Sequence, residues 1–206
     1  MVYILPHWTH PTMEAGELIP VWVYTSGDEA ELIVNEESLG RKKRGVNWDE
    51  MQIEWLVPLT EGSVEAVAYR DGVQIARTCQ KSAGAPSHLD INGDVNGDEL
   101  SVVTLSQTDN CGTLYPYGEN RVYAKIYGNA YILSFESGSP VDVECNFGAE
   151  SKECFFGLNR QFINKKGDDP ISFRAVTTSS LYLWAALMPH PISTRCRWLV
   201  SSFISF

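Results

Sequence analysis

The sequence predicts an all-β protein built from two tandem immunoglobulin-like β-sandwich modules, followed by an irregular or non-native C-terminal tail. Apolar and polar residues alternate along most of the chain, which is the two-residue period of half-buried strands. These strand-like runs recur at intervals of about 8–12 residues with turn residues between them. No segment has the period of an amphipathic helix. A chain of 206 residues can hold two modules of about 100 residues each.

The first module is expected over residues 13–83. Asp71-Gly72 is a two-residue hairpin signal, because both residue types tolerate a positive φ. Asn35-Glu36 occupies the place of a second hairpin turn, although glutamate is poorly suited to that geometry. The strand-like runs of this module are Glu17–Thr25, Ala30–Val34, Met51–Pro58, Ser63–Gly72 and Val73–Gln80.

The second module is expected over residues 88–175. Residues 84–87 are the expected interdomain joint, because "AGAP" at Ala83–Pro86 is a stretch of small residues and proline. Residues 1–12, before the first module, are interpreted as the remnant of a linker. The strand-like runs of the second module are Leu100–Gln107, Arg121–Gly128, Ala130–Gly138 and Cys154–Ile163.

Residues 176–206 form a tail that differs in kind from the rest of the chain. None of the residues after Asp169 is acidic, although the chain has 26 Asp and Glu residues in all. Strand alternation is also lost, and Pro189 and Pro191 interrupt the apolar run. We hypothesise that the reading frame has shifted after about Ala175. The test is whether another frame of the gene encodes a valine-rich closing strand.

The composition argues against several classes of partner. With a net charge of −10 and a pI near 4.8, the chain lacks the basic surface that nucleic acids and anionic membranes require. A glycan or a protein is the expected partner. No signal peptide is recognised at the N-terminus and no apolar run reaches the ~20 residues of a membrane span, so the chain as written is expected to be cytoplasmic.

The five cysteines indicate neither a disulfide framework nor a zinc site. Their number is odd and no pair has the C-x-x-C spacing. Buried free thiols are therefore expected, and no metal or other cofactor is predicted.

One polar stretch, "DINGDVNGDEL" at Asp90–Leu100, invites comparison with a calcium-binding loop. An EF-hand loop needs glycine at its sixth position and a carboxylate at its twelfth. A loop that starts at Asp90 ends at Ser101, and one that starts at Asn92 ends at Val103, so neither supplies the carboxylate. We interpret the stretch as a turn and keep weak calcium binding as the alternative.

Sequence motifs give no catalytic residue. There is no G-x-S-x-G elbow, P-loop or H-E-x-x-H motif. Trp8 and Trp48 lie in polar, loop-like stretches and are the candidate glycan contacts, because aromatic faces stack on sugar rings. Trp22 and Trp55 fall on predicted strands and are expected in the core.

The run Ile19–Lys42 resembles a segment of glycoside hydrolase family 2 enzymes, especially β-galactosidase-like ones, that follows their catalytic barrel. The family pattern there is V-x-V-Y-T, D-x-x-E-L and N-G-x-S-L-G. It is matched by Val21, Val23, Tyr24, Thr25, Asp28, Glu31, Leu32, Asn35, Ser38, Leu39 and Gly40. Glu36 replaces the turn glycine of that pattern. Trp55–Thr78 and Asp109–Gly128 also resemble the region downstream in that family.

The resemblance implies that the chain is a detached, non-catalytic C-terminal fragment of such an enzyme. The two catalytic glutamates of the family lie on a barrel of about 250 residues, whose strand–helix alternation is absent here. The implied partner is that barrel, against which the fragment would pack. The alternatives are a stand-alone glycan-binding module and a calcium-dependent docking module, and a complete small hydrolase is not expected.

Overall fold

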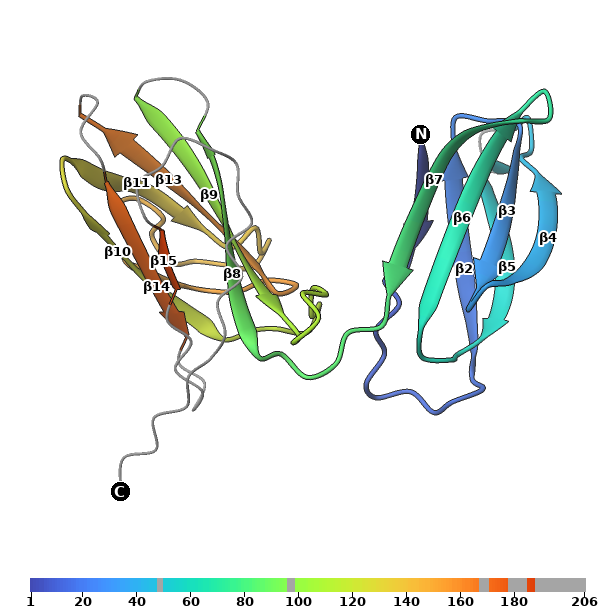
Figure 1. The fold of residues 1–206 in the computed structure, drawn as a ribbon, viewed down its shortest axis with the longest axis horizontal. Coiled ribbons are helices and arrows are strands. Elements are labelled where there is room, and N and C mark those ends of the chain that lie inside the picture. Colours follow the sequence, from blue (N-terminus) through green and yellow to red (C-terminus); the bar gives the residue numbers. More distant parts are fainter. Residues whose placement is uncertain (48–49, 96–98, 167–170, 178–184, 188–206) are drawn as a thin grey trace. The chain divides into compact units, whose positions relative to one another are not determined.

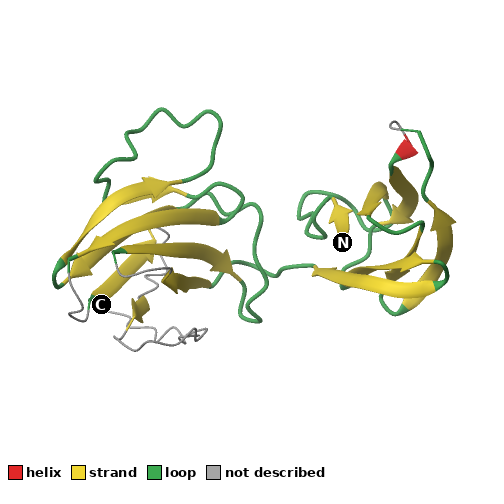
Figure 2. Cartoon of the chain, turned by 90° about the horizontal axis from the view of Figure 1, so that it is seen from above, coloured by secondary structure: helices red, strands yellow, loops and turns green. Residues whose placement is uncertain are grey.

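The computed structural model describes residues 1–47, 50–95, 99–166, 171–177 and 185–187. The chain divides into two compact units, Met1–Ser82 and Ala83–Phe206. Strands and loops make up nearly all of the described chain (Figures 1 and 2). The described residues contain no α-helix, and the short red segment in Figure 2 is a 3₁₀ turn at Glu50. The predicted all-β fold of tandem sandwich modules is therefore confirmed.

The first unit is a sandwich of two antiparallel sheets, with strand orders β1-β2-β5 and β4-β3-β6-β7 (Figure 1). Consecutive strands β3 and β4, and β6 and β7, are joined as hairpins. The strands are β1 (Val2–Leu5), β2 (Leu18–Thr25), β3 (Glu29–Val34), β4 (Glu37–Lys43), β5 (Gln52–Pro58), β6 (Ser63–Arg70) and β7 (Val73–Lys81).

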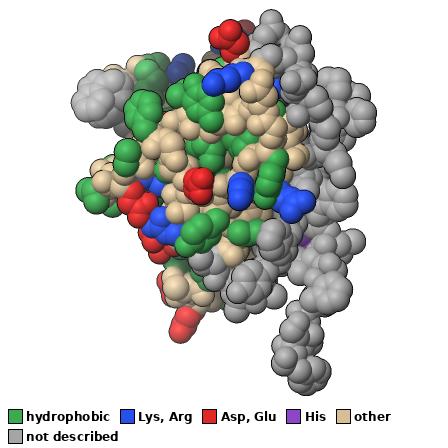
Figure 3. All heavy atoms as spheres, turned by 90° about the vertical axis from the view of Figure 1, so that its left-hand side faces the viewer, with side chains coloured by type: hydrophobic (Ala, Val, Ile, Leu, Met, Phe, Trp, Pro, Cys, Tyr) green, Lys and Arg blue, Asp and Glu red, His purple; other side chains and the backbone are tan. Residues whose placement is uncertain are grey.

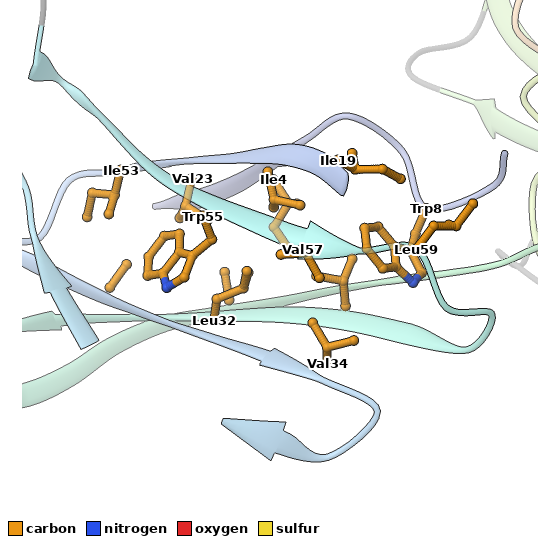
Figure 4. Close-up of a cluster of buried hydrophobic side chains, with 14 residues drawn as sticks. Ile4, Trp8, Ile19, Val23, Leu32, Val34, Ile53, Trp55, Val57 and Leu59 are labelled. Carbon is orange, nitrogen blue, oxygen red and sulfur yellow. The ribbon is translucent and has the colours of Figure 1, made fainter. Parts of the chain in front are cut away.

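The core of this unit lies between the two sheets (Figure 4). Every second residue of β2 and β5 is buried, as the sequence alternation predicted. Leu32 from the facing sheet packs into the same cluster. The other labelled members are Ile4, Trp8, Ile19, Val23, Val34, Ile53, Trp55, Val57 and Leu59.

Residues 1–12, expected to be a linker remnant, instead contribute to the first unit. Strand β1 pairs antiparallel with β2, with Val2 opposite Thr25. Ile4 and Trp8 are fully buried in the core. A four-residue strand is too short for its alternation to be recognised, which is why sequence reasoning missed it.

The Asn35-Glu36 turn is tight even though Glu36 replaces glycine. Val34 pairs directly with Glu37, so only two residues connect β3 and β4. Both turn residues have positive φ values, 48° for Asn35 and 71° for Glu36. The Asn35 side chain accepts a hydrogen bond from the backbone amide of Ser63 (2.8 Å). This hydrogen bond to the first residue of β6 holds the turn in place.

The second unit has two four-stranded sheets, with strand orders β12-β10-β14-β15 and β11-β13-β9-β8. Its own core includes Leu105, Val122, Phe135 and Phe173. The strands are β8 (His88–Val95), β9 (Leu100–Thr108), β10 (Arg121–Tyr127), β11 (Ala130–Glu136), β12 (Ser151–Glu153), β13 (Leu158–Lys165), β14 (Ser172–Thr177) and β15 (Ala185–Leu187).

The stretch interpreted as a turn at Asp90–Leu100 is mostly strand. Residues up to Val95 belong to β8, which pairs with β9 from His88 opposite Thr108 to Val95 opposite Ser101. Asp90 and Asn92 therefore lie on a strand, next to the buried Leu89 and Ile91. The interpretation as a turn is wrong for Asp90–Val95.

The start of the second unit is fixed by Asp109. Its carboxylate accepts hydrogen bonds from the backbone amides of Gly84 (2.9 Å), Cys111 (2.8 Å) and Thr113 (2.8 Å). Gly84 belongs to the predicted joint, so part of this joint is held against the loop that follows β9.

The atypical tail predicted over 176–206 falls largely outside the described residues. Within it, β14 continues to Thr177, and β15 pairs with β14 at Ala185 opposite Ala175. The frame-shift hypothesis stays a prediction.

The cysteine environments differ from the expected burial. Among the described residues, Cys154 is buried, whereas Cys79, Cys111 and Cys145 are exposed. Across the described part of the chain, no helix has the length and apolar character that crossing a membrane would require.

Candidate functional site: an acidic pocket in the second unit

A pocket of about 400 Å³ opens on the second unit between β12, the start of β10 and the loop after β11. Figure 3 shows one face of this unit, on which hydrophobic, basic and acidic side chains are interspersed. The residues that line the pocket are Glu119, Ser137, Ser139, Val141, Asp142, Val143, Glu144, Glu153, Cys154 and Phe155.

A buried lysine, Lys152, holds one wall of the pocket. It lies opposite Val122 in the β10–β12 pair, and its side chain is 1% exposed. Its ammonium group forms a 2.8 Å ion pair with Asp142 and donates a hydrogen bond to the backbone carbonyl of Glu144 (2.9 Å). The hydrogen bond from Lys152 lowers the pKa of Asp142. A buried ammonium requires such partners, so Lys152 fastens the loop to the sandwich.

Arg121 at the start of β10 holds two further acidic groups of the pocket, Glu144 and Glu153. Its guanidinium binds both carboxylate oxygens of Glu144, and it also contacts Glu153 at 3.4 Å. The hydrogen bond from Arg121 lowers the pKa of Glu144. Two carboxylates therefore share one guanidinium and are held on the same side of it.

This arrangement is poorly suited to glycosidic bond cleavage. A glycosidase places two carboxyl groups on opposite sides of the scissile bond and raises the pKa of one so that it can donate a proton. In the pocket, the pKa values of Asp142 and Glu144 both move down. The network is that of a structural ion-pair cluster, which positions the loop between β11 and β12.

The pocket cysteine is equally unsuited to nucleophilic chemistry. Burial raises the pKa of Cys154 to about 12. Its thiol donates a hydrogen bond to Asn159 Oδ1. Since the thiolate is the reactive form, Cys154 is a structural thiol at neutral pH.

The predicted glycan contacts do not line the pocket. Trp8 is 1% exposed and its indole lies in the core of the first unit (Figure 4), where a sugar ring cannot stack on it. Trp48 lies outside the described residues, so a glycan contact there stays a prediction. Trp55 is buried as expected, but Trp22 is 39% exposed on the outer face of β2 and is not a core residue.

Sequence reasoning missed the Arg121–Lys152 cluster. Its members come from a loop, from a three-residue strand and from the start of β10, so no local motif joins them. Acidic residues between Ser137 and Glu153 are no denser than in other parts of the chain, so the sequence carried no distinct signal for this cluster.

In the part of the chain that the structure describes, no group of three or more His, Cys, Asp or Glu side chains is placed to hold a metal ion. The calcium alternative at Asp90–Leu100 includes residues outside that part and stays a prediction.

Comparisons with known proteins match this chain to a small part of larger glycosidases. Residues 16–76 match a family model described as "Domain of unknown function (DUF4982)". A putative β-glucuronidase of Formosa agariphila is 45% identical over 168 residues, which are 79% of this chain and 16% of that protein. The β-galactosidase BoGH2A of Bacteroides ovatus is 30% identical over 163 residues, or 76% of this chain and 18% of that protein. The chain thus spans less than a fifth of either relative.

Solved structures give the same result for the fold. A β-glycosidase from Bacteroides vulgatus superposes with a TM-score of 0.79 at 28% identity, over 91% of this chain and 24% of that one. A glycosyl hydrolase family 2 member from Bacteroides cellulosilyticus superposes with a TM-score of 0.77 at 27% identity, over 89% of this chain and 25% of that one.

Proposed function

Because this chain is a segment of a glycoside hydrolase family 2 protein, we propose that it is a non-catalytic accessory part of a glycosidase. In this role, its β-sandwich units pack against the catalytic barrel of the parent enzyme and hold that barrel in position. The chain itself supplies no acid or base to the reaction.

The observation that carries this proposal is that the chain matches only a small part of each relative, and that its described residues form strands and loops. It corresponds to 16% of one curated relative and 18% of another. A (β/α)₈ barrel needs about 250 residues of alternating strand and helix. The 206 residues here could not supply it, and the described part consists of strands and loops.

The pocket chemistry supports the same proposal. Three of its carboxylates, those of Asp142, Glu144 and Glu153, are engaged by Arg121 or Lys152, and the pKa values of Asp142 and Glu144 are lowered. A general acid for glycoside cleavage needs the opposite shift.

The proposal is tested with the matching segment of the Formosa agariphila relative. Deleting this segment from the relative is expected to lower the melting temperature of the remaining enzyme and its turnover of chromogenic β-glucuronides. The 206-residue chain alone is expected to turn over neither β-glucuronides nor β-galactosides. An unchanged melting temperature and unchanged kinetics after deletion would refute an accessory role. Turnover by the chain alone, abolished by Glu144→Gln, would refute the non-catalytic assignment.

The second candidate function is a glycan-binding module. The observation in its favour is the pair of exposed tyrosines, Tyr123 and Tyr127, on the outer side of β10. Aromatic faces of this kind can stack on sugar rings. Titration with galactosides and galactan oligosaccharides while intrinsic fluorescence is recorded tests it. Saturable quenching that Tyr123→Ala or Tyr127→Ala removes would favour binding at these tyrosines, and quenching that Trp48→Ala removes would favour binding at the position predicted from the sequence.

A further inference from the structure

The first unit has one sheet whose outer side is apolar although it faces solvent. Strands β1, β2 and β5 bury every second side chain, and the alternate side chains point outward. Eight of these ten outward side chains are apolar or aromatic. We call the set the outer apolar face: Tyr3, Leu5, Leu18, Pro20, Trp22, Tyr24, Gln52, Glu54, Leu56 and Pro58.

Strand register makes this face continuous. Leu5 lies opposite Trp22 in the β1–β2 pair. Pro20 lies opposite Leu56, and Leu18 opposite Pro58, in the β2–β5 pair. Directly opposed side chains on one face of a sheet have Cβ atoms about 5 Å apart, so these residues form one patch rather than isolated exposed positions.

The other sheet of the same sandwich provides an internal comparison. Its outer side carries three ion pairs, which join β3 to β4 and β6 to β7. Their nitrogen–oxygen distances are 3.3 Å for Arg41–Glu31, 3.9 Å for Lys43–Glu29 and 2.5 Å for Arg77–Glu65. The sandwich therefore carries ion pairs on the outer side of one sheet and mostly apolar side chains on the outer side of the other.

This asymmetry indicates an interface. An antiparallel sheet with one solvated side alternates apolar-in and polar-out. A contiguous exposed apolar patch on a soluble protein marks a surface that another molecule or domain covers. Tyrosine, tryptophan and leucine at the centre, with few charges, also match the composition of an interface core.

We infer that the outer apolar face is the surface through which this chain packs against the catalytic barrel of its parent enzyme. This inference rests on the proposed accessory function and assigns it a surface. The matched relatives are more than five times as long as the segment they share with this chain, so most of the parent's surface is outside it. Pairing of two copies is disfavoured by the net charge of −10 on each.

The test uses a chimera in which this chain replaces the matching segment of the Formosa agariphila relative. Hydroxyl-radical footprinting compares side-chain oxidation in the chimera with oxidation in the isolated chain. Leu56 and Val73 are a matched pair, because they are 63% and 66% exposed and lie on opposite sheets of one unit. The oxidation rates of Trp22 and Leu56 are expected to fall several-fold in the chimera, and that of Val73 to stay unchanged.

Substitutions provide an independent measurement. Leu56→Glu places a charge on the outer apolar face and is expected to lower the melting temperature of the chimera, whereas Val73→Glu is expected to leave it unchanged. In the isolated chain, where neither side chain is covered, the two variants are expected to unfold alike.

Three results would overturn the inference. If Trp22 and Leu56 stay as reactive in the chimera as in the isolated chain, another surface carries the packing. If Trp22 and Leu56 are already protected from oxidation in the isolated chain, the barrel is not what covers them. If that protection disappears together with a dimer on dilution, a second copy is the occupant. Deletion of the segment from the relative distinguishes failure of this inference from failure of the proposed accessory function. Deletion has no effect on the relative only if the accessory function itself is wrong.

Discussion

At the residue scale, the hairpin at Asn35-Glu36 stores backbone strain that can be released. Glu36 has a φ of 71°, in the left-handed region that disfavours a side chain. We expect Glu36→Gly to stabilise the first unit by up to about 1 kcal/mol, because glycine adopts this conformation freely. Urea unfolding measures the change. Glu37→Gly, one residue later in β4, is the control and should instead destabilise. Equal effects of the two substitutions would contradict this account of the turn.

The carboxylate of Asp109 makes the stability of the second unit depend on pH. Burial raises its pKa, but hydrogen bonds from the amides of Gly84, Thr113 and Cys111 outweigh burial, and the net pKa is lowered. A lowered folded pKa stabilises the protein above the unfolded value of about 3.9, and this contribution is lost as pH falls through the folded pKa. We expect the wild-type chain to lose more stability than Asp109→Asn between about pH 5 and pH 2, measured by urea unfolding. If the unfolding free energies of the two proteins changed with pH in parallel, this account of Asp109 would be contradicted.

Lys152 should be far more important for stability than the surface ion pairs. Its side chain is 1% exposed and pairs with Asp142, whereas Arg41, which pairs with Glu31, is 46% exposed. Removing one member of a buried pair costs about 3–5 kcal/mol, and an exposed pair contributes about 0–1 kcal/mol. Lys152→Ala is therefore expected to destabilise strongly and Arg41→Ala weakly in chemical denaturation. Similar small losses would show that Lys152 is not held as described.

At the scale of elements, substitutions near the N-terminus test directly whether residues 1–12 belong to the first unit or form a linker. Ile4 and Leu5 are neighbours in β1, but Ile4 is buried in the core and Leu5 points outward. We expect Ile4→Ala to cost about 2–5 kcal/mol and Leu5→Ala much less, because only the first opens a cavity. Unfolding of each variant followed by tryptophan fluorescence measures the difference. If both substitutions were neutral, residues 1–12 would behave as the linker that the sequence suggested.

The strands that sequence reasoning identified share a strong alternation of apolar and polar residues. Leu18–Thr25 and Gln52–Pro58 were recognised because each buries every second side chain. Six strands of the described chain, β1, β4, β8, β12, β14 and β15, were missed, and the first three show separate reasons. Val2–Leu5 is too short for a period, Glu37–Lys43 has no buried position, and His88–Val95 carries Asn, Asp and Gly residues that favour turns.

The candidate site was less predictable than the strands, because its parts are brought together by tertiary structure. Arg121 and Glu144 are 23 residues apart in sequence, and no local spacing reports their ion pair. The burial of Trp8 was missed for a related reason. Its polar neighbours in "PHWTHP" suggested a loop, while the core that covers its indole comes from β2, β5 and the residue after β5.

At the scale of the whole molecule, the two units have separate hydrophobic cores. The first core contains Leu32 and the second contains Leu105, each fully buried. The outward side chains of β2 and β5 are outside both cores, which is why they remain available for an interface. Each core should therefore respond to substitution on its own.

This independence gives a prediction for calorimetry of the 206-residue chain. Leu32→Ala and Leu105→Ala each delete a buried side chain that is 0% exposed, one in each unit. Such a change costs about 2–5 kcal/mol, which corresponds to a fall of roughly 10 °C or more in the melting temperature of a unit of this size. We expect Leu32→Ala to lower one unfolding transition and Leu105→Ala to lower the other. A single transition that both variants shift equally would mean that the units unfold cooperatively, and that the division at Ser82 does not separate two independently stable sandwiches.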